Sequence, residues 1–299
     1  MKSVLRAVLL ALLLAAQWAV AATTEVTDDR GQRSQWSHPP QRVVSLLPSV
    51  TESVCALGAC ERLVGVDNYS NWPAQAASLP HVGGLEDANV EHIVSLRPDV
   101  VLLSRSARVT ERLEALGLRV LAFEPDSLAD MERVLRQLGA LLGRQAQASA
   151  LWRDMDTGVS KVAAGLSTHA RGQRVYFEVD SAPYAASESS FVGQVLSRLG
   201  MANVVPASMG PFPKLNPEFV VKANPQLIML GDRNVVALST RPGWQGIDAI
   251  RNKRICVFTP AQGDVLVRPG PRVAEAAQIM ADCVKRMTSA TQAGEGATK

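Results

Sequence analysis

The sequence predicts an α/β fold with two lobes, each built on a mostly parallel sheet, joined by one long helix. Three observations support this. The segment 89–103, NVEHIVSLRPDVVLL, recurs loosely 127 residues later as NPEFVVKANPQLIML, too long a period for a solenoid. Apolar strand-like runs alternate with helical segments on both sides of the chain's middle. Between these halves, residues 127–168 carry apolar side chains at helical spacing.

Each copy of the repeat describes a short capped helix that leads into a buried strand. Asn89 and Asn216 stand at the N-cap position, and Glu91 and Glu218 fall in the first turn, where the helix dipole favours a carboxylate. A proline then ends each helix before the strand. The two copies are either a chance echo or equivalent points on matching lobes.

The N-terminus is expected to be a signal peptide, residues 1–21. Lys2 and Arg6 precede an apolar run that is too short to span a membrane, and Ala19-Val20-Ala21 has the small-x-small form of a cleavage site. Export of the mature protein follows from this. Residues 22–41 are polar and are predicted to be a loose leader with one strand-like piece, with order beginning at Arg42.

The remaining chain divides into four segments. We predict an N-terminal lobe over 42–144, an interlobe helix over 145–168 of roughly 35 Å, a C-terminal lobe over 169–287, and a disordered polar tail over 288–299. The length of 299 residues is sufficient for two domains with their own cores.

Composition and motifs argue against several classes of function. The formal net charge is only +3 and no Lys/Arg run occurs, so nucleic-acid binding is not expected. No nucleophile elbow, phosphate-binding loop or zinc-protease motif is present, so neither an enzyme nor a bound cofactor is expected. Export allows disulfides, and pairing Cys55 with Cys60 and Cys256 with Cys283 is the simplest of three connectivities.

Aromatic side chains occur in corresponding loops of the two lobes. Tyr69 and Trp72 lie in the first lobe, and Tyr184 and Phe212 in the second. Two lobes with aromatic loops between them describe a cleft for a flat or apolar-faced ligand, unless these rings fill their own lobes. Further along, Asp264 and Arg268 could contact that ligand or pair with each other.

Three stretches resemble a known family: RVVSLLPSVTE at 42–52, VGVDNYSNWP at 64–73, and HVGG followed by NVEHIVSLRPDVVL. They are similar to the class III, helical-backbone periplasmic substrate-binding proteins, which serve ABC importers of cobalamin, ferric siderophores and haem. The resemblance implies two Rossmann-like lobes, a monomer without a cofactor, and an ABC transporter permease dimer as partner. It also implies that Glu91 and Glu218 dock onto arginines of the two permease subunits.

The closest resemblance is to the cobalamin-binding branch, which implies a corrinoid ligand. It places Tyr69, Tyr184, Phe212, Asp264 and Arg268 in the ligand pocket. Leu85 and Ser104 fall where that branch carries tryptophans, so the pocket is expected to be wider or differently shaped. Haem or a ferric siderophore is the alternative ligand, and an exported enzyme that uses the cleft is a second alternative.

Overall fold

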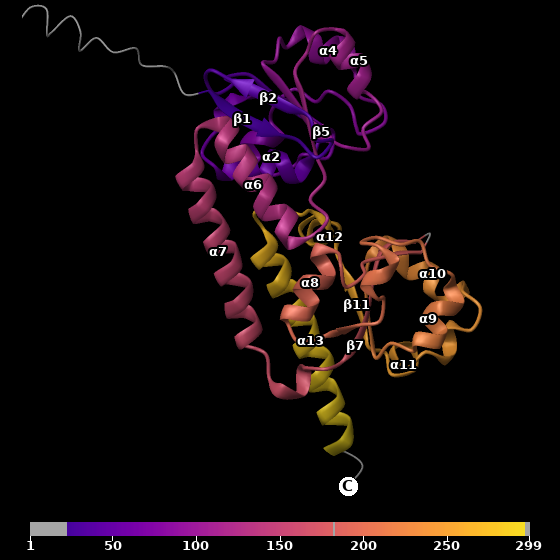
Figure 1. Cartoon of the computed structure of the whole chain (residues 1–299). Helices are drawn as coiled ribbons and strands as arrows, with labels where there is room; N and C mark the ends of the chain where they lie inside the picture. Colours follow the sequence, from indigo (N-terminus) through magenta and orange to yellow (C-terminus); the bar gives the residue numbers. More distant parts are fainter. Residues whose placement is uncertain (1–22, 182, 297–299) are drawn as a thin grey trace, which may run out of the picture.

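The protein folds into two α/β lobes that are connected through a long helix (Figure 1). This computed structural model describes residues 23–181 and 183–296. The predicted signal peptide, residues 1–21, lies outside that range. The fold class predicted from the sequence is confirmed, with one mainly parallel sheet in each lobe.

The N-terminal lobe has a four-stranded parallel sheet in the order β4-β3-β5-β6. Its strands are buried and consist mainly of branched apolar residues, as expected for a sheet covered on both faces. The elements are β3 (Val43–Ser45), α2 (Pro48–Ala56), β4 (Leu63–Val66), α3 (Ala74–Ala77), α4 (Val90–Ser95), β5 (Val100–Ser104), α5 (Thr110–Ala115), β6 (Val120–Phe123) and α6 (Leu128–Leu142).

The C-terminal lobe repeats this plan around parallel β11, β10 and β7, with β8 antiparallel to β7 at one edge. The elements are β7 (Arg174–Asp180), β8 (Tyr184–Ala185), α8 (Phe191–Arg198), β9 (Ala202–Asn203), α9 (Pro217–Ala223), β10 (Leu227–Gly231), α10 (Val235–Thr240), α11 (Asp248–Arg251), β11 (Ile255–Phe258), α12 (Pro260–Val267) and α13 (Val273–Gly296).

The two sequence repeats form matching units. The Asn89 side chain accepts a hydrogen bond from the His92 amide at 2.9 Å, and the Asn216 side chain accepts one from the Glu218 amide at 3.0 Å. Beyond these caps the units agree further, because a residue with positive φ follows each helix closely, Arg97 after α4 and Asn224 after α9. The following strands, β5 and β10, pair in parallel with β3 and β7. The repeat is therefore structural and not a chance echo.

The segment predicted as a loose leader is instead an ordered β-hairpin. β1 (Thr24–Thr27) and β2 (Arg33–Trp36) pair antiparallel, and β1 packs against α6. The hairpin buries the side chains of Val26 and Trp36, and Asp29 forms an ion pair with Arg133 of α6. Only these two apolar side chains anchor the hairpin. The segment is therefore polar in composition, which explains why it was predicted to be a loose leader.

The predicted disordered tail is also corrected, because α13 continues to Gly296. No proline interrupts this stretch, and each residue added to an existing helix gains one backbone hydrogen bond. The last residues, 297–299, lie outside the described range. Of the described helices, none is both long and apolar enough to cross a membrane.

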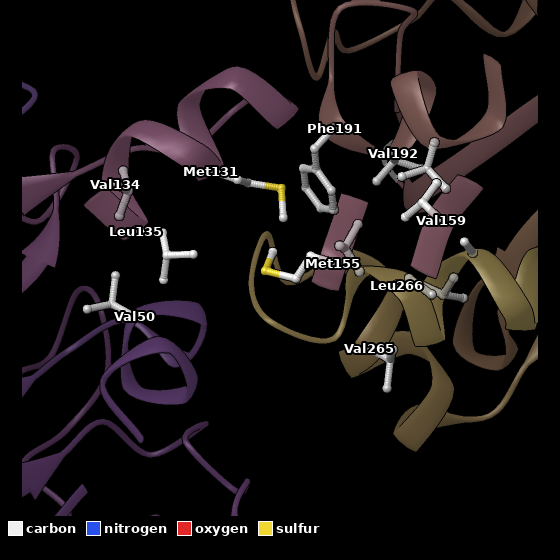
Figure 2. Packing of buried hydrophobic residues seen from close by; sticks show 14 of the residues in the cluster. Val50, Met131, Val134, Leu135, Met155, Val159, Phe191, Val192, Val265 and Leu266 are labelled. Carbon is white, nitrogen blue, oxygen red and sulfur yellow. The ribbon is translucent and has the colours of Figure 1, made fainter. Parts of the chain in front are cut away.

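The long helix predicted over 145–168 is α7 (Gln145–Ala164), and it packs against α6 and α13. Figure 2 shows the apolar cluster at this junction, where Met155 of α7 lies between Val50 and Leu135 of the first lobe and Leu266 of the second. One continuous core thus links both lobes to the helix, which favours a stiff connection between them.

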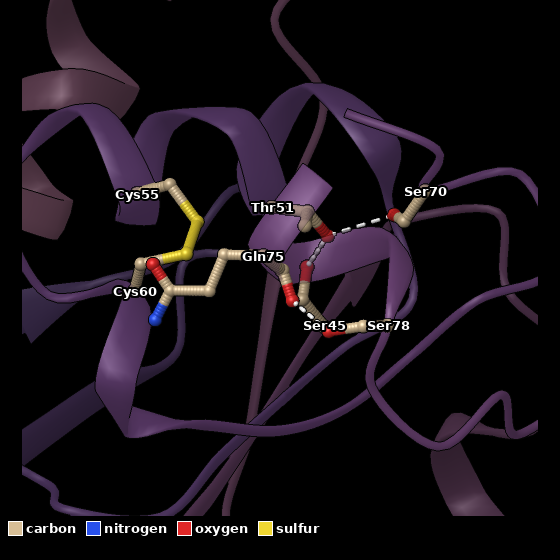
Figure 3. Close-up of a disulfide and its surroundings, with 7 residues drawn as sticks. All are labelled: Ser45, Thr51, Cys55, Cys60, Ser70, Gln75 and Ser78. Carbon is tan, nitrogen blue, oxygen red and sulfur yellow. Dashed lines mark hydrogen bonds between the residues drawn. A yellow bond between two sulfur atoms is a disulfide. The ribbon is translucent and has the colours of Figure 1, made fainter. Parts of the chain in front are cut away.

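Two disulfides join the four cysteines in the predicted pairs. Cys55 at the end of α2 is bonded to Cys60, and Cys256 in β11 is bonded to Cys283 in α13 (Figure 3 shows the first). The first closes a tight local turn, with five residues of sequence separation, and the second fixes the edge strand of the C-terminal sheet to the last helix.

Candidate functional site

A pocket of about 380 Å³ opens where the N-terminal lobe meets the end of α12. The first lobe contributes the segment after β3, the segment after β4 and a later turn, and the second lobe contributes the C-terminal end of α12. The lining residues are Leu46, Leu47, Pro48, Ser49, Asp67, Tyr69, Leu85, Asp264, Val267, Arg268 and Pro269. Four of the predicted ligand residues, Tyr69, Leu85, Asp264 and Arg268, therefore lie together in one pocket.

On the N-terminal side of this pocket the exposed apolar side chains are Tyr69 and Leu85, with 66% and 37% of their surface accessible, and Val267 of α12 is 44% exposed on the other side. The turn that carries Leu85 depends on Gly83, which has φ of +97° and whose Cβ, if present, would lie 2.5 Å from the Asp87 carbonyl oxygen. The Asp87 carboxylate in turn accepts a hydrogen bond from the Gly84 amide at 2.7 Å. Large exposed apolar groups held by a tight turn are typical of a binding surface.

Beneath Tyr69 lies a buried polar network, part of which Figure 3 shows. The Asp67 carboxylate accepts a hydrogen bond from the Tyr69 amide at 2.7 Å and one from the Ser70 hydroxyl. Ser70 is linked to Thr51, and Thr51 to Ser45, each at 2.9 Å. Burial raises the pKa of the Asp67 carboxyl above its ordinary value, and the hydrogen bonds from Ser70 and Tyr69 offset this only in part.

This raised pKa gives a prediction for stability against pH. A folded-state pKa above the unfolded one means that the folded protein binds more protons, so the contribution of Asp67 is most favourable below the unfolded pKa and declines as pH rises through the folded pKa. We expect Asp67→Asn to gain stability relative to the wild type as pH rises above about 4. Urea unfolding at a series of pH values measures this difference, and one that is constant or falls with pH would contradict it.

Asp264 and Arg268 pair with each other, which is one of the two roles that the sequence allowed. The two residues are one helical turn apart at the end of α12, and the distance from Asp264 Oδ2 to Arg268 Nη2 is 3.0 Å. The Asp264 carboxylate also accepts a hydrogen bond from the Asn71 side chain at 2.8 Å. Only 9% of the Arg268 side chain is exposed, so it borders the pocket without projecting into it.

A second compartment of about 240 Å³ adjoins the first, since Asp264 and Val267 line both. It lies at the carboxyl ends of β7, β10 and β11, where α/β sheets bind their ligands. Among the described residues, acidic side chains outnumber basic ones in the two compartments. The acids are Asp67, Glu178, Asp180, Asp232 and Asp264, and the bases are Arg233 and Arg268. Two of these acids are already paired, Glu178 with Arg241 and Asp264 with Arg268.

The other predicted pocket residues lie elsewhere. Trp72 is 40% exposed, with the Arg272 guanidinium 4.9 Å from its ring centroid. Phe212 packs edge-on against Phe191 in the apolar core, and Tyr184 is half-exposed in the edge strand β8. Ser104, which stands where the cobalamin-binding branch carries a tryptophan, is buried, and its hydroxyl donates a hydrogen bond to Glu124 at 2.8 Å. None of these four lines the two compartments described above.

Glu91 and Glu218 are exposed in the first turns of α4 and α9, one in each lobe. In Figure 1 these helices lie on the opposite side of the molecule from α7. The Glu91 carboxylate is 2.8 Å from Arg112, and both side chains are mostly exposed. An ion pair of this kind contributes little to stability, so Glu91 can exchange partners at small cost.

Sequence reasoning missed Glu52, a carboxylate that is 1% exposed and bonded to Arg268 and Arg272 of the other lobe. The available signal was a lone acidic residue among the small and apolar side chains of α2, because such a group requires a partner. Among the described residues no cluster of three or more His, Cys, Asp or Glu side chains could hold a metal ion.

Two lobes with mainly parallel sheets, a connecting helix and a pocket where the lobes meet define a class III periplasmic binding protein. Residues 43–261 match the family described as periplasmic binding protein, and the chain belongs to that family.

Relatives within the family differ in the ligands named for them. The chain is 30% identical over 244 residues to a vitamin B12-binding protein of Pectobacterium carotovorum, covering 80% of this chain and 86% of that one. It is 28% identical over 256 residues to an uncharacterized ABC transporter substrate-binding lipoprotein of Bacillus subtilis, covering 82% and 80%. A periplasmic heme-binding protein of Pseudomonas aeruginosa has a similar structure, with a TM-score of 0.70, 26% identity, and coverage of 81% and 91%.

Proposed function

We propose that this protein captures a corrinoid, with cobalamin as the first candidate, in the pocket between its lobes and delivers it in the periplasm to an ABC importer. The observation that carries the proposal is the contrast between the two sides of the cleft. Tyr69 and Leu85 present an apolar surface on one side, and carboxylates of the second lobe, including Asp232, lie on the other.

This charge balance favours a neutral, amide-rich ligand. A corrin ring carries amide side chains, whose N–H groups can donate to carboxylates, and its flat apolar parts suit the Tyr69 surface. Haem carries two propionates and ferric siderophores are commonly anionic, so both would place negative charge beside Asp232. Of the two lining guanidinium groups, Arg268 is already occupied by Asp264 and Glu52.

The direct test is a calorimetric titration of the purified protein with cyanocobalamin, and in parallel with haemin and a ferric hydroxamate chelate. One-to-one binding of cyanocobalamin with the highest affinity supports the proposal. Tight haemin binding without cyanocobalamin binding, with a visible-band shift that Tyr69→Ala removes, would assign the protein to haem instead.

A single substitution tests the apolar side of the cleft. Tyr69→Ala removes an exposed ring that a bound corrinoid would cover, so we expect the dissociation constant for cyanocobalamin to rise roughly 30-fold, equivalent to about 2 kcal/mol. Leu116→Ala, which also shortens an exposed apolar side chain but at the end of α5, is the matched control and should leave the constant unchanged. Equal constants for the Tyr69 variant and the wild type would remove Tyr69 from the binding surface.

A further inference from the structure

A buried ion-pair cluster connects the two lobes beside the pocket. Glu52 of α2 accepts two hydrogen bonds from Arg272, at 2.9 and 2.7 Å, and one from Arg268 at 3.0 Å. We call these three residues the interlobe latch. The partners are 216 and 220 residues apart in sequence, and their side chains are 1%, 9% and 14% exposed for Glu52, Arg268 and Arg272.

The Arg268 guanidinium also holds the loop that carries Tyr69. Its Nη1 donates to Asn71 Oδ1 at 2.9 Å as well as to Glu52, and its Nη2 donates to the Tyr69 carbonyl oxygen at 2.9 Å and lies 3.0 Å from Asp264 Oδ2. Each terminal nitrogen of arginine carries two N–H groups, so three of the four terminal donors are used in hydrogen bonds, and the ion pair with Asp264 occupies the remaining side of Nη2. A ligand could bind to Nη1 or Nη2 only by displacing an existing partner.

The loop is thus fixed from both lobes. From its own lobe, Asp67 accepts the Tyr69 amide at 2.7 Å, and from the other lobe Arg268 donates to the Tyr69 carbonyl. Arginine suits this task because its planar fork fixes several acceptors at defined angles. Displacing Arg268 toward a ligand would leave the Glu52 carboxylate buried with one partner fewer, which is costly.

We propose that Arg268 is a positioning residue, which acts through the interlobe latch to hold the Tyr69 loop in its binding conformation, and does not contact the ligand itself. Glu52 is also a positioning residue, because it orients Arg268, which in turn holds the Tyr69 loop. The part of this inference that concerns ligand affinity rests on the proposed function; the part that concerns the loop does not.

Hydrogen–deuterium exchange tests the loop without any ligand. In Arg268→Gln we expect the amides of residues 67–72 to exchange about tenfold faster than in the wild type, because local opening of the loop is no longer opposed from the second lobe. Arg198→Gln breaks an ion pair with Asp156 outside the latch and is the matched control, with unchanged exchange over 67–72. Arg268→Lys keeps the positive charge but loses the planar guanidinium, so it should give intermediate exchange rates. It replaces Arg268→Gln in this test if the glutamine variant does not fold. Unchanged exchange in a folded Arg268 variant overturns the proposal.

A double-mutant cycle with cyanocobalamin as probe then separates positioning from contact. We expect Arg268→Gln to weaken binding about tenfold in the wild type, but less than twofold when Tyr69→Ala is already present, because its effect passes through Tyr69. Independent, multiplicative losses would mean that Arg268 binds the ligand directly and would overturn the proposal. If cyanocobalamin does not bind the wild type, the proposed function fails, and the exchange measurement still decides the positioning role.

Discussion

Replacing both Glu91 and Glu218 with lysine is expected to abolish the stimulation of ATP hydrolysis by the importer while leaving ligand affinity unchanged. The two carboxylates occupy equivalent capped helices in the two lobes, so a two-fold symmetric permease can meet each with the same basic pocket. Charge reversal replaces two attractions with two repulsions, and we expect docking to weaken on the order of 100-fold. Each single variant should fall between the double variant and the wild type.

The measurement is ATP hydrolysis by a reconstituted importer that the wild-type protein stimulates, with the cyanocobalamin titration run on the same preparations. The control is Glu132→Lys with Asp154→Lys, which makes an identical change in net charge on α6 and α7. If the control is equally inactive, the effect is one of net charge and not of docking. A loss of ligand affinity in the Glu91 and Glu218 variant would show that these glutamates belong to the pocket.

The parts of the fold that could be predicted from the sequence are those encoded locally. The N-caps Asn89 and Asn216 and the strands that follow them depend on residues within about fifteen positions, and both units form as predicted. The long helix α7 was equally predictable, because its apolar period is uninterrupted by proline. The cysteine pairs were predictable to the extent that the simplest connectivity also joins neighbouring elements.

What could not be predicted depends on contacts between distant segments. The pairing of Glu52 with Arg268 requires two lobes to meet in one orientation, and no spacing rule relates positions 216 residues apart. The candidate site shows the same limit. Tyr69 lines the pocket, but the partly buried Phe212 packs against Phe191 at the margin of the core, although both were equally plausible as loop aromatics. Whether a loop ring faces a cleft or a core is decided by tertiary packing.

The two disulfides differ in how far they constrain the unfolded chain. The bond between Cys55 and Cys60 closes a loop with a separation of five residues, and the bond between Cys256 and Cys283 one with a separation of 27. In the chain-entropy account these loops correspond to about 2 and about 3.5 kcal/mol of stabilisation. The longer loop also joins β11, whose carboxyl end borders the second compartment, to the helix that packs against α7.

Removing the longer disulfide is therefore expected to be the more damaging change. We expect Cys256→Ala with Cys283→Ala to lower the free energy of unfolding by about 3.5 kcal/mol, and Cys55→Ala with Cys60→Ala by about 2 kcal/mol. Urea unfolding of both variants, compared with the wild type before and after reduction by dithiothreitol, measures these differences. Both Cys256 and Cys283 are fully buried, so the first variant also loses packing around two sulfur atoms, which adds to its deficit. An equal or larger loss in the Cys55 and Cys60 variant would show that local structure in α2, and not loop length, determines the contribution of these bonds.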